Sequence, residues 1–565
     1  MEIYVSSTVR NTKMKNATII IKFTIFYWVL TWSNSGFVHG FRYAVHQPLF
    51  GSRSRSLYSQ QHTICNLSQT TSEVLTTACN NLNEALKSCN DVFKDVKVQV
   101  APTATSRCGL VATQKIRKGE SVVSIPFADD IILTPKMAKS IFALTEDYNS
   151  WTGDNGLLAL VLLHEVSIAY GTNPSQRGAL QTNLMKSWIA SLPTLEECRQ
   201  AHPLLWKDET QEVLQKSSTK KIFQILDDIE DDFSWLESQI LSKDKSRYPQ
   251  VVGNNLPCFS LEGFQWAMAM VSSRAAYLDR MLRLVPIVDF ANHNDVDTEE
   301  VQSGYFGTFG TTAGVQIKAS RDYDQGDEVF VSYGPKSAAE YLLDHGFIPP
   351  QCYRGVSVAE LTFELDENDR FQDDKLDILE FETYEQAPME PIQSFDVVAT
   401  TARDVTPDPV MMQFLRLIKL GGTDAFLLES IFRKEVWGFM SQPVSQKNEL
   451  EVVNLVIDKC TMALKDMDSV AIVGDDNLYS LANRDRDMSE PITPEVLCAT
   501  VRAVERRAFI RMKEFMERDR DALDLKEYYQ ERRLKDLGLD SAWDPENSDV
   551  GWSSARKPGG GELDW

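Results

Sequence analysis

The spacing of apolar residues predicts a chain that alternates between helical and extended segments. From residue 73 to 89, apolar side chains recur every three or four residues, the period of an amphipathic helix. Residues 96–100 alternate between valine and polar side chains and predict a strand. Two more β-branched segments, 109–113 and 121–126, flank the turn-forming sequence 117–120 and predict a β-hairpin.

The period changes after about residue 135. Residues 135–242 carry helical patterning, and their most apolar stretch, 157–163, is too short to cross a bilayer. Strand-like segments return at 284–288 and 328–332. We therefore predict a β-rich core that is interrupted by a helical insertion at about 135–255.

The C-terminal part of the chain is predicted to be helical. Apolar residues follow helical faces at 450–464 and 497–515, and Thr493-Pro494 supplies an N-cap and a first-turn proline for the second of these helices. The pattern predicts an all-α domain over 351–543. The tail, 544–565, is rich in Gly, Asp and Ser and is predicted to be disordered.

Composition narrows the functional classes. The 565 residues carry a net charge of −23, which repels phosphate backbones and argues against nucleic-acid binding. The nine cysteines form no C-x-x-C pair and only seven histidines are present, so no structural metal site is expected.

The N-terminus differs chemically from the rest of the chain. Residues 1–40 combine basic residues with an apolar core at 23–32 and small residues before Gly40, the layout of a signal peptide. Residues 41–72 contain Ser and Arg but no acid, which is typical of a transit peptide. Together they are similar to the bipartite presequences of algae whose plastids lie behind an extra membrane. The alternatives are a non-cleaved anchor, a start at Met14, or a secreted protein with a disordered tail.

Four ordered motifs in the body of the chain carry a family resemblance. They are the pair 264–267 and 271–274 (FQWA and VSSR), VPIVDFANH at 285–293, GDEVFVSYG at 326–334, and EYLLDHGF at 340–347. Together they resemble the SET-domain protein methyltransferases, especially the subgroup of the Rubisco large-subunit lysine methyltransferase. The resemblance implies an α+β fold: a SET-domain β-core with a pseudoknot and a helical insertion over 73–350, followed by the helical substrate-binding domain.

The resemblance also implies S-adenosylmethionine as the cofactor. Arg274 would bind its carboxylate, since a planar guanidinium suits a bidentate carboxylate. The other residues implied to contact the cofactor are Arg107, Gly109, Leu110, Asp289, Asn292, His293 and Tyr333. A surface role for Arg274 and a local turn at Asn292-His293 are the structural alternatives.

Tyr333 stands at the family's catalytic tyrosine position, with a packed strand-end tyrosine as the alternative. Tyr305, His345 and Phe347 are implied to line the channel for the target lysine, although a plain loop role for Tyr305 is equally open. His345 departs from the family, in which a tyrosine is usual. Arg107 departs as well, since it stands where the first glycine of a Gly-x-Gly motif is usual.

These expectations combine into one function. The chain is expected to be an S-adenosylmethionine-dependent protein-lysine N-methyltransferase that acts on Rubisco large subunit or another protein of the plastid stroma. We expect a monomer that binds its protein substrate through the C-terminal domain, with no metal, no nucleic acid and no membrane insertion after processing. The alternatives are a protein-histidine methyltransferase of the same fold, a non-catalytic binding scaffold, and a location in the secretory pathway.

Overall fold

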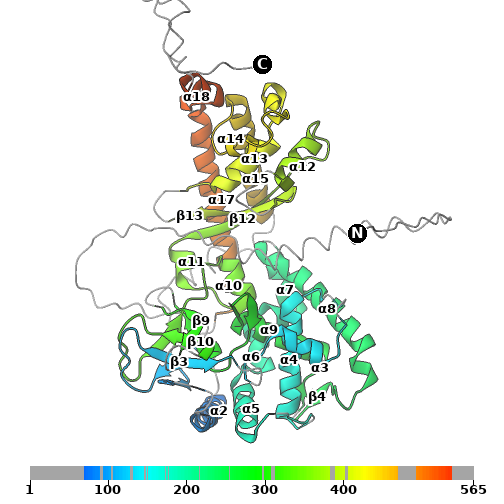
Figure 1. The fold of residues 1–565 in the computed structure, drawn as a ribbon, viewed down its shortest axis with the longest axis vertical. Coiled ribbons are helices and arrows are strands. Elements are labelled where there is room, and N and C mark those ends of the chain that lie inside the picture. Colours follow the sequence, from blue (N-terminus) through cyan, green and yellow to red (C-terminus); the bar gives the residue numbers. More distant parts are fainter. Residues whose placement is uncertain are drawn as a thin grey trace, which may run out of the picture. The chain divides into compact units, whose positions relative to one another are not determined.

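The computed structural model describes residues 69–536, apart from short gaps and longer ones at 307–311, 382–387 and 469–491. The predicted signal peptide, nearly all of the transit-peptide-like segment, and the C-terminal tail lie outside the described residues. The chain divides into two compact units, Met1–Gly355 with Ala471–Ala503, and Val356–Val470 with Val504–Trp565 (Figure 1).

A four-stranded sheet of the first unit joins distant parts of the sequence. Its order is β1 (Val98–Ala101), β2 (Gly109–Ala112), β11 (Glu328–Val331) and β8 (Asn292–His293). The β1–β2 and β2–β11 pairs are antiparallel, whereas β11 and β8 run parallel. The strands predicted at 96–100 and 328–332 are confirmed, and in β1 the valines are buried while the glutamine between them is exposed.

A three-stranded antiparallel sheet has the order β3 (Ser121–Pro126), β10 (Thr312–Lys318) and β9 (Val301–Phe306), which lie side by side in Figure 1. The predicted hairpin between 109–113 and 121–126 was therefore wrong. Both strands exist, but β2 pairs with β1 and β11, whereas β3 pairs with β10. Short apolar strands bury more surface against distant partners than a two-stranded hairpin allows.

The strand predicted at 284–288 was also wrong. A short antiparallel pair, β6 (Ala276–Leu278) and β7 (Met281–Arg283), ends just before it, and the 3-10 helix η5 (Val288–Phe290) follows. Ile287 has a φ of 79°, which breaks any extended run. The apolar side chains of this segment are buried because the segment crosses the core, and they do not form a ladder.

Helices surround the two larger sheets of the first unit, which also contains the β6–β7 pair and the short pair of β4 (Val251–Val252) with β5 (Leu256–Pro257). Helix α4 (Gly153–Ala169) contains the apolar run 157–163 and packs against α3 (Pro135–Ile141), α5 (Ala179–Ser191) and α9 (Leu261–Arg274). Its all-round hydrophobicity therefore reflects a core position. None of the helices within the described residues is long and apolar enough to cross a membrane. The other helices of this unit are α2 (Gln69–Ser88), α3 (Pro135–Ile141), α5 (Ala179–Ser191), α6 (Leu195–Ala201), α7 (Asp208–Gln211), α8 (Lys221–Gln239), α9 (Leu261–Arg274), α10 (Ala338–His345) and α11 (Pro350–Arg354).

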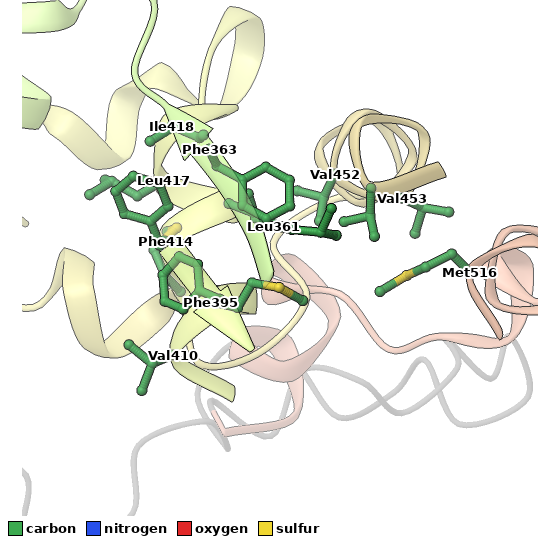
Figure 2. Close-up of a cluster of buried hydrophobic side chains, with 14 of the residues drawn as sticks. Leu361, Phe363, Phe395, Val410, Phe414, Leu417, Ile418, Val452, Val453 and Met516 are labelled. Carbon is green, nitrogen blue, oxygen red and sulfur yellow. The ribbon is translucent and has the colours of Figure 1, made fainter. Parts of the chain in front are cut away.

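The second unit is largely helical but contains one hairpin. Strands β12 (Ser357–Glu364) and β13 (Ile392–Ala399) pair along their full length, so the expectation of an all-helical domain missed this sheet. Alternate residues of the hairpin, including Phe363 and Phe395, bury against Phe414 of α13 (Figure 2). The helices are α12 (Gln372–Phe381), α13 (Pro409–Ile418), α14 (Val436–Phe439), α15 (Gln446–Asp468), α17 (Pro494–Asp521) and α18 (Tyr529–Asp536).

Two helices of the C-terminal part confirm the sequence patterns. Helix α15 covers the predicted segment 450–464, and α17 begins at Pro494 as the Thr493-Pro494 pair predicted. Val452 and Val453 of α15 and Met516 of α17 belong to the same buried cluster (Figure 2). Residues of α17 up to Ala503 group with the first unit and the later ones with the second.

Candidate active site

The parallel pairing of β8 with β11 places His293 beside the segment that leads to Tyr333. His293 is 2% exposed, and its Nδ1 accepts a hydrogen bond from the main-chain N–H of Tyr333 at 3.2 Å. An accepting Nδ1 leaves the proton on Nε2, which lies 3.0 Å from the Tyr341 hydroxyl oxygen. Tyr341 in turn donates to the Gly334 carbonyl at 2.8 Å. His293 therefore holds the 333–334 turn in place and is not placed as a general base.

Asn292 ties the segment before β2 to β11. Its side-chain amide donates to the Ser106 hydroxyl at 2.6 Å, to the Cys108 carbonyl at 3.1 Å and to Glu328 Oε1 at 2.7 Å. Gly109 lies against this cluster, and a Cβ at that position would collide with both Glu328 Oε1 and Asn292 Nδ2. Glycine is therefore required here by close packing.

Arg274 and Asp289 form a buried ion pair. Arg274, the last residue of α9, directs Nη1 to the Asp289 carbonyl at 3.1 Å and to Asp289 Oδ2 at 3.2 Å. The Asp289 side chain is 0% exposed and also accepts from Trp188 Nε1. Burial raises the pKa of Asp289 to about 6, and the Arg274 charge opposes this rise. Within the described part of the chain, Nε and Nη2 of Arg274 make no hydrogen bond.

Tyr333 lies in an aromatic stack. Its ring faces His293, with ring centroids 5.1 Å apart, and His345, with centroids 4.6 Å apart. The hydroxyl donates to the Ala291 carbonyl at 2.9 Å. Because burial raises the pKa of Tyr333 to about 12, the phenol keeps its proton at neutral pH. Because the phenol proton is directed at the Ala291 carbonyl, the phenol can only accept a hydrogen bond from another neighbouring group, through its oxygen lone pairs.

His345 adds a second acceptor to this stack. Its Nδ1 lies 3.2 Å from the Ser273 carbonyl, and since a carbonyl only accepts, Nδ1 carries the proton. Nε2 is buried and has no hydrogen-bond partner among the described residues. Burial lowers the pKa of His345 well below 6.5, so the ring is neutral. Phe347 lies against His345, with ring centroids 6.1 Å apart.

Arg107 connects the same region to helix α6. Its Nε donates to Glu197 at 2.8 Å and its Nη1 donates to the Ser191 carbonyl at 2.6 Å. Glu197 also closes the capping box of α6 with Thr194. The Arg107 guanidinium is thus held by the helical insertion, at the position where the family resemblance would place a glycine.

A cavity of about 180 Å³ joins these groups. We call it the site cavity, and the predicted residues that line it are Arg107, Arg274, Asp289, Asn292, His293, Tyr333, His345 and Phe347. Gly109 and Leu110 are not lining residues: Gly109 packs behind Asn292, and Leu110 is buried in β2. Tyr305 is not brought to the cavity either, because it lies on β9 and is 74% exposed.

Other residues of the site were not singled out from the sequence. Ser106, Cys108, Glu197 and His202 line the cavity, and Glu328 holds Asn292. The spacing of Thr194 and Glu197 is typical of a capping box and could have indicated the start of α6, but it gives no sign of the contact with Arg107. No group of three or more potential metal ligands occurs among the residues that the structure describes.

The lining of the site cavity suits the amino-acid end of S-adenosylmethionine, which carries a carboxylate. Nε and Nη2 of Arg274 have no hydrogen-bond partner among the residues that the structure describes, and a carboxylate can accept from them. Asn292 and the main chain around Cys108 add polar groups to the lining, and Tyr333, His345 and Phe347 add aromatic rings. The residues present therefore fit the expected cofactor.

Two family models match the chain. The first, described as the SET domain, covers residues 107–334, and the second, described as Rubisco LSMT substrate-binding, covers residues 366–509. The two matches follow one another in the order that the sequence motifs predicted.

Curated relatives and solved structures agree with these matches. The chain is 29% identical over 460 residues to the chloroplastic Rubisco large subunit N-methyltransferase of Nicotiana tabacum, covering 80% of this chain and 84% of the relative. It is 31% identical over 443 residues to the chloroplastic fructose-bisphosphate aldolase-lysine N-methyltransferase of Arabidopsis thaliana, covering 76% and 81%.

Two solved structures of Rubisco LSMT match with 27% identity, over 84% of this chain and 98% of theirs. The one with lysine and AdoHcy has a TM-score of 0.65, and the one with AdoMet has a TM-score of 0.63. The chain therefore belongs to the SET-domain family of S-adenosylmethionine-dependent protein-lysine N-methyltransferases, in the group that carries the Rubisco LSMT substrate-binding domain.

Proposed function

We propose that this chain transfers a methyl group from S-adenosylmethionine to the side-chain amine of a lysine in a protein of the plastid stroma. The observation that carries the proposal is the site cavity itself. It contains the Arg274 guanidinium, whose Nε and Nη2 have no partner within the described part of the chain, and the buried, protonated phenol of Tyr333.

The residues of the site divide the work between binding and orientation. When bound, S-adenosylmethionine supplies an electrophilic methyl group on a positively charged sulfur. Arg274 would hold the carboxylate of the cofactor, and Asn292 and the main chain near Cys108 would hold its polar atoms. Tyr333 orients the lysine nitrogen, because its oxygen lone pairs can accept N–H and weak C–H contacts while its own proton is engaged by Ala291. A buried site disfavours the ammonium form, which leaves the lysine nitrogen free to attack.

The second unit is proposed to bind the protein substrate, since residues 366–509 match the substrate-binding model. The named relatives act on Rubisco large subunit and on fructose-bisphosphate aldolase. We infer that the substrate is a stromal enzyme of this kind, and that the chain works as a monomer. Light scattering measures the molar mass in solution and so tests whether the chain is a monomer.

A labelling experiment tests the activity. The purified chain is incubated with tritiated-methyl S-adenosylmethionine and a stromal extract, and labelled proteins are identified by mass spectrometry. We expect methyl groups on lysine with the wild-type chain and almost none with Tyr333→Phe. Label on histidine, or no label from a chain that binds the cofactor, would contradict the proposal.

Delivery to the plastid is proposed to depend on residues 1–72, which combine the signal-peptide and transit-peptide-like segments. Fusing these residues to a fluorescent protein should place it in plastids. Replacing Phe41 by Ala should divert the fusion protein to the endoplasmic reticulum or to the membranes around the plastid. A cytosolic signal from the intact segment would refute the routing.

A further inference from the structure

The turn that carries Tyr333 is closed by a ring of hydrogen bonds. The main-chain N–H of Tyr333 donates to Nδ1 of His293 at 3.2 Å, and Nε2 of His293 lies 3.0 Å from the Tyr341 hydroxyl oxygen. The Tyr341 hydroxyl donates to the Gly334 carbonyl at 2.8 Å. The ring therefore begins and ends on two adjacent residues, and one side chain from β8 and one from α10 close it.

Only one arrangement of protons satisfies this ring. A main-chain N–H can only donate and a carbonyl can only accept, so the Tyr333 and Gly334 ends are both fixed. Nδ1 of His293 must then accept, Nε2 must carry the proton, and Tyr341 must accept from Nε2 while it donates to Gly334. A charged imidazole has a proton on both nitrogens and would place a donor against the Tyr333 N–H. The ring therefore requires neutral His293 in a single tautomer.

Tyr341 is held firmly enough to act as a tether. Its side chain is 2% exposed, and its ring lies against His293 and Phe347, with centroids 5.1 and 5.9 Å apart. Helix α10 packs against α9, and a capping box between Ser337 and Glu340 fixes its first turn. Tyr341 is not a lining residue of the site cavity, so it can influence the reaction only through the residues that it holds.

The turn itself depends on such tethers. The Tyr333 hydroxyl donates to the Ala291 carbonyl at 2.9 Å, and the Tyr333 main chain takes part in the ring. Gly334 has a φ of 86°, a conformation that glycine adopts readily, and its backbone is intrinsically flexible. Among the residues that the structure describes, Tyr341 is the one that donates to the Gly334 carbonyl. The Tyr341 hydroxyl thus limits the freedom of the residue next to Tyr333.

We propose that Tyr341 is a positioning residue for methyl transfer, which keeps the Tyr333 phenol where it meets the lysine nitrogen. Without the Tyr341 hydroxyl, the Gly334 carbonyl loses its donor and the imidazole proton of His293 loses its nearest acceptor. The Tyr333 ring can then shift, and a displacement of about 1 Å can cost a hundredfold in a rate that depends on orientation. The effect on rate rests on the proposed function, whereas the ring of hydrogen bonds does not.

Tyr341→Phe tests the positioning, because it removes one hydroxyl and keeps the packed ring. With the stromal protein that the wild type labels, kcat should fall about ten- to a hundredfold, while the KM for that protein and the calorimetric affinity for S-adenosylmethionine stay nearly unchanged. Tyr148→Phe is the matched control, since Tyr148 is also buried and its hydroxyl donates to Asp232 away from the cavity, and it should keep the wild-type kcat. An unchanged kcat in folded Tyr341→Phe, or equal losses in both variants, would overturn the proposal.

A second variant separates the tether on Gly334 from general support of the imidazole. The Gln351 side chain also approaches Nε2 of His293, at 3.4 Å, but within the described part of the chain it makes no hydrogen bond to Gly334. Gln351→Leu should therefore lower kcat much less than Tyr341→Phe does. Equal losses in these two variants would refute the part assigned to the Gly334 carbonyl.

Imidazole nitrogen NMR tests the ring without any substrate. The chain is prepared with isotope-labelled histidine, and the His293 signals are identified by their loss in His293→Gln. We expect the neutral tautomer with its proton on Nε2, and the Nε2 signal should shift in Tyr341→Phe but not in Tyr148→Phe. A proton on Nδ1 in the wild type would overturn the ring. If the wild type methylates no protein, the proposed function fails while the NMR result stands.

Discussion

The buried ion pair of Arg274 with Asp289 makes the stability of the chain depend on pH in a way that one substitution should change. Asp289 is fully buried, and its pKa is raised to about 6 by burial in spite of the attraction of Arg274. Arg274→Met removes the positive charge and keeps an apolar side chain of similar length. The pKa of Asp289 should then rise further, because burial still raises it and the hydrogen bonds that oppose the rise, from Trp188 and from the Ile287 main chain, remain without the Arg274 charge.

The size of the pH dependence follows from the linkage between proton binding and folding. Between pH 3.8 and about 6, the folded state holds a proton on Asp289 that the unfolded state has lost, so the free energy of unfolding falls as the pH rises. Above about pH 6 this contribution no longer changes with pH. In Arg274→Met, the free energy of unfolding continues to fall as the pH rises above 6. At pH 7.5 the extra loss reaches at most about 2 kcal/mol, which is about 1.36 kcal/mol for each pH unit above 6. At pH 5 the extra loss is close to zero, because the carboxyl is protonated in both folded proteins.

Urea denaturation followed by tryptophan fluorescence at pH 5 and 7.5 measures this difference. Arg274→Lys keeps the charge and should show a smaller dependence on pH than Arg274→Met. In the Asp289→Asn background, Arg274→Met should cost the same at both pH values, since no carboxyl remains to titrate. Equal losses for Arg274→Met at pH 5 and 7.5 in the otherwise wild-type chain would refute the assigned coupling.

Three further substitutions test the site. Tyr333→Phe should lower kcat for methyl transfer about a hundred- to a thousandfold with the cofactor affinity nearly unchanged, since the stacked ring remains, and a fully active variant would remove Tyr333 from the reaction. Gly109→Ala should weaken S-adenosylmethionine binding in calorimetry, because its Cβ has no room, whereas Val111→Ala on the same strand should not; equal affinities would contradict this. His345→Tyr should keep activity and change the ratio of mono- to trimethylated lysine in mass spectra, and an unchanged ratio would place His345 outside the lysine channel.

The motifs of the sequence located much of the candidate site. Arg274, Asn292, His293 and Tyr333 were singled out from short segments, and all four line one cavity. The sequence did not indicate which residues these side chains contact. Trp188 lies 101 residues from Asp289, and nothing in the local sequence of either residue indicates that contact.

Tyr305 is a candidate that the fold does not bring to the cavity, in line with the plain role left open for it. An aromatic residue shortly after the Asn292-His293 segment suggested a channel wall, but the strand that carries it faces outward and leaves the side chain 74% exposed. Which face of a strand meets a cavity depends on its register with its neighbours, and the register of β9 is set by β10.

The sequence by itself determined the elements whose causes are local. Helix α2 follows from apolar spacing, α17 begins at Pro494 because capping and proline act within one turn, and β11 follows from its β-branched pattern. Only the tertiary structure decided which strands pair, because β2 and β3 find partners far along the chain. It also decided the chemistry of Asp289, since the ionisation of a side chain depends on its burial and on the charges that the fold brings near it.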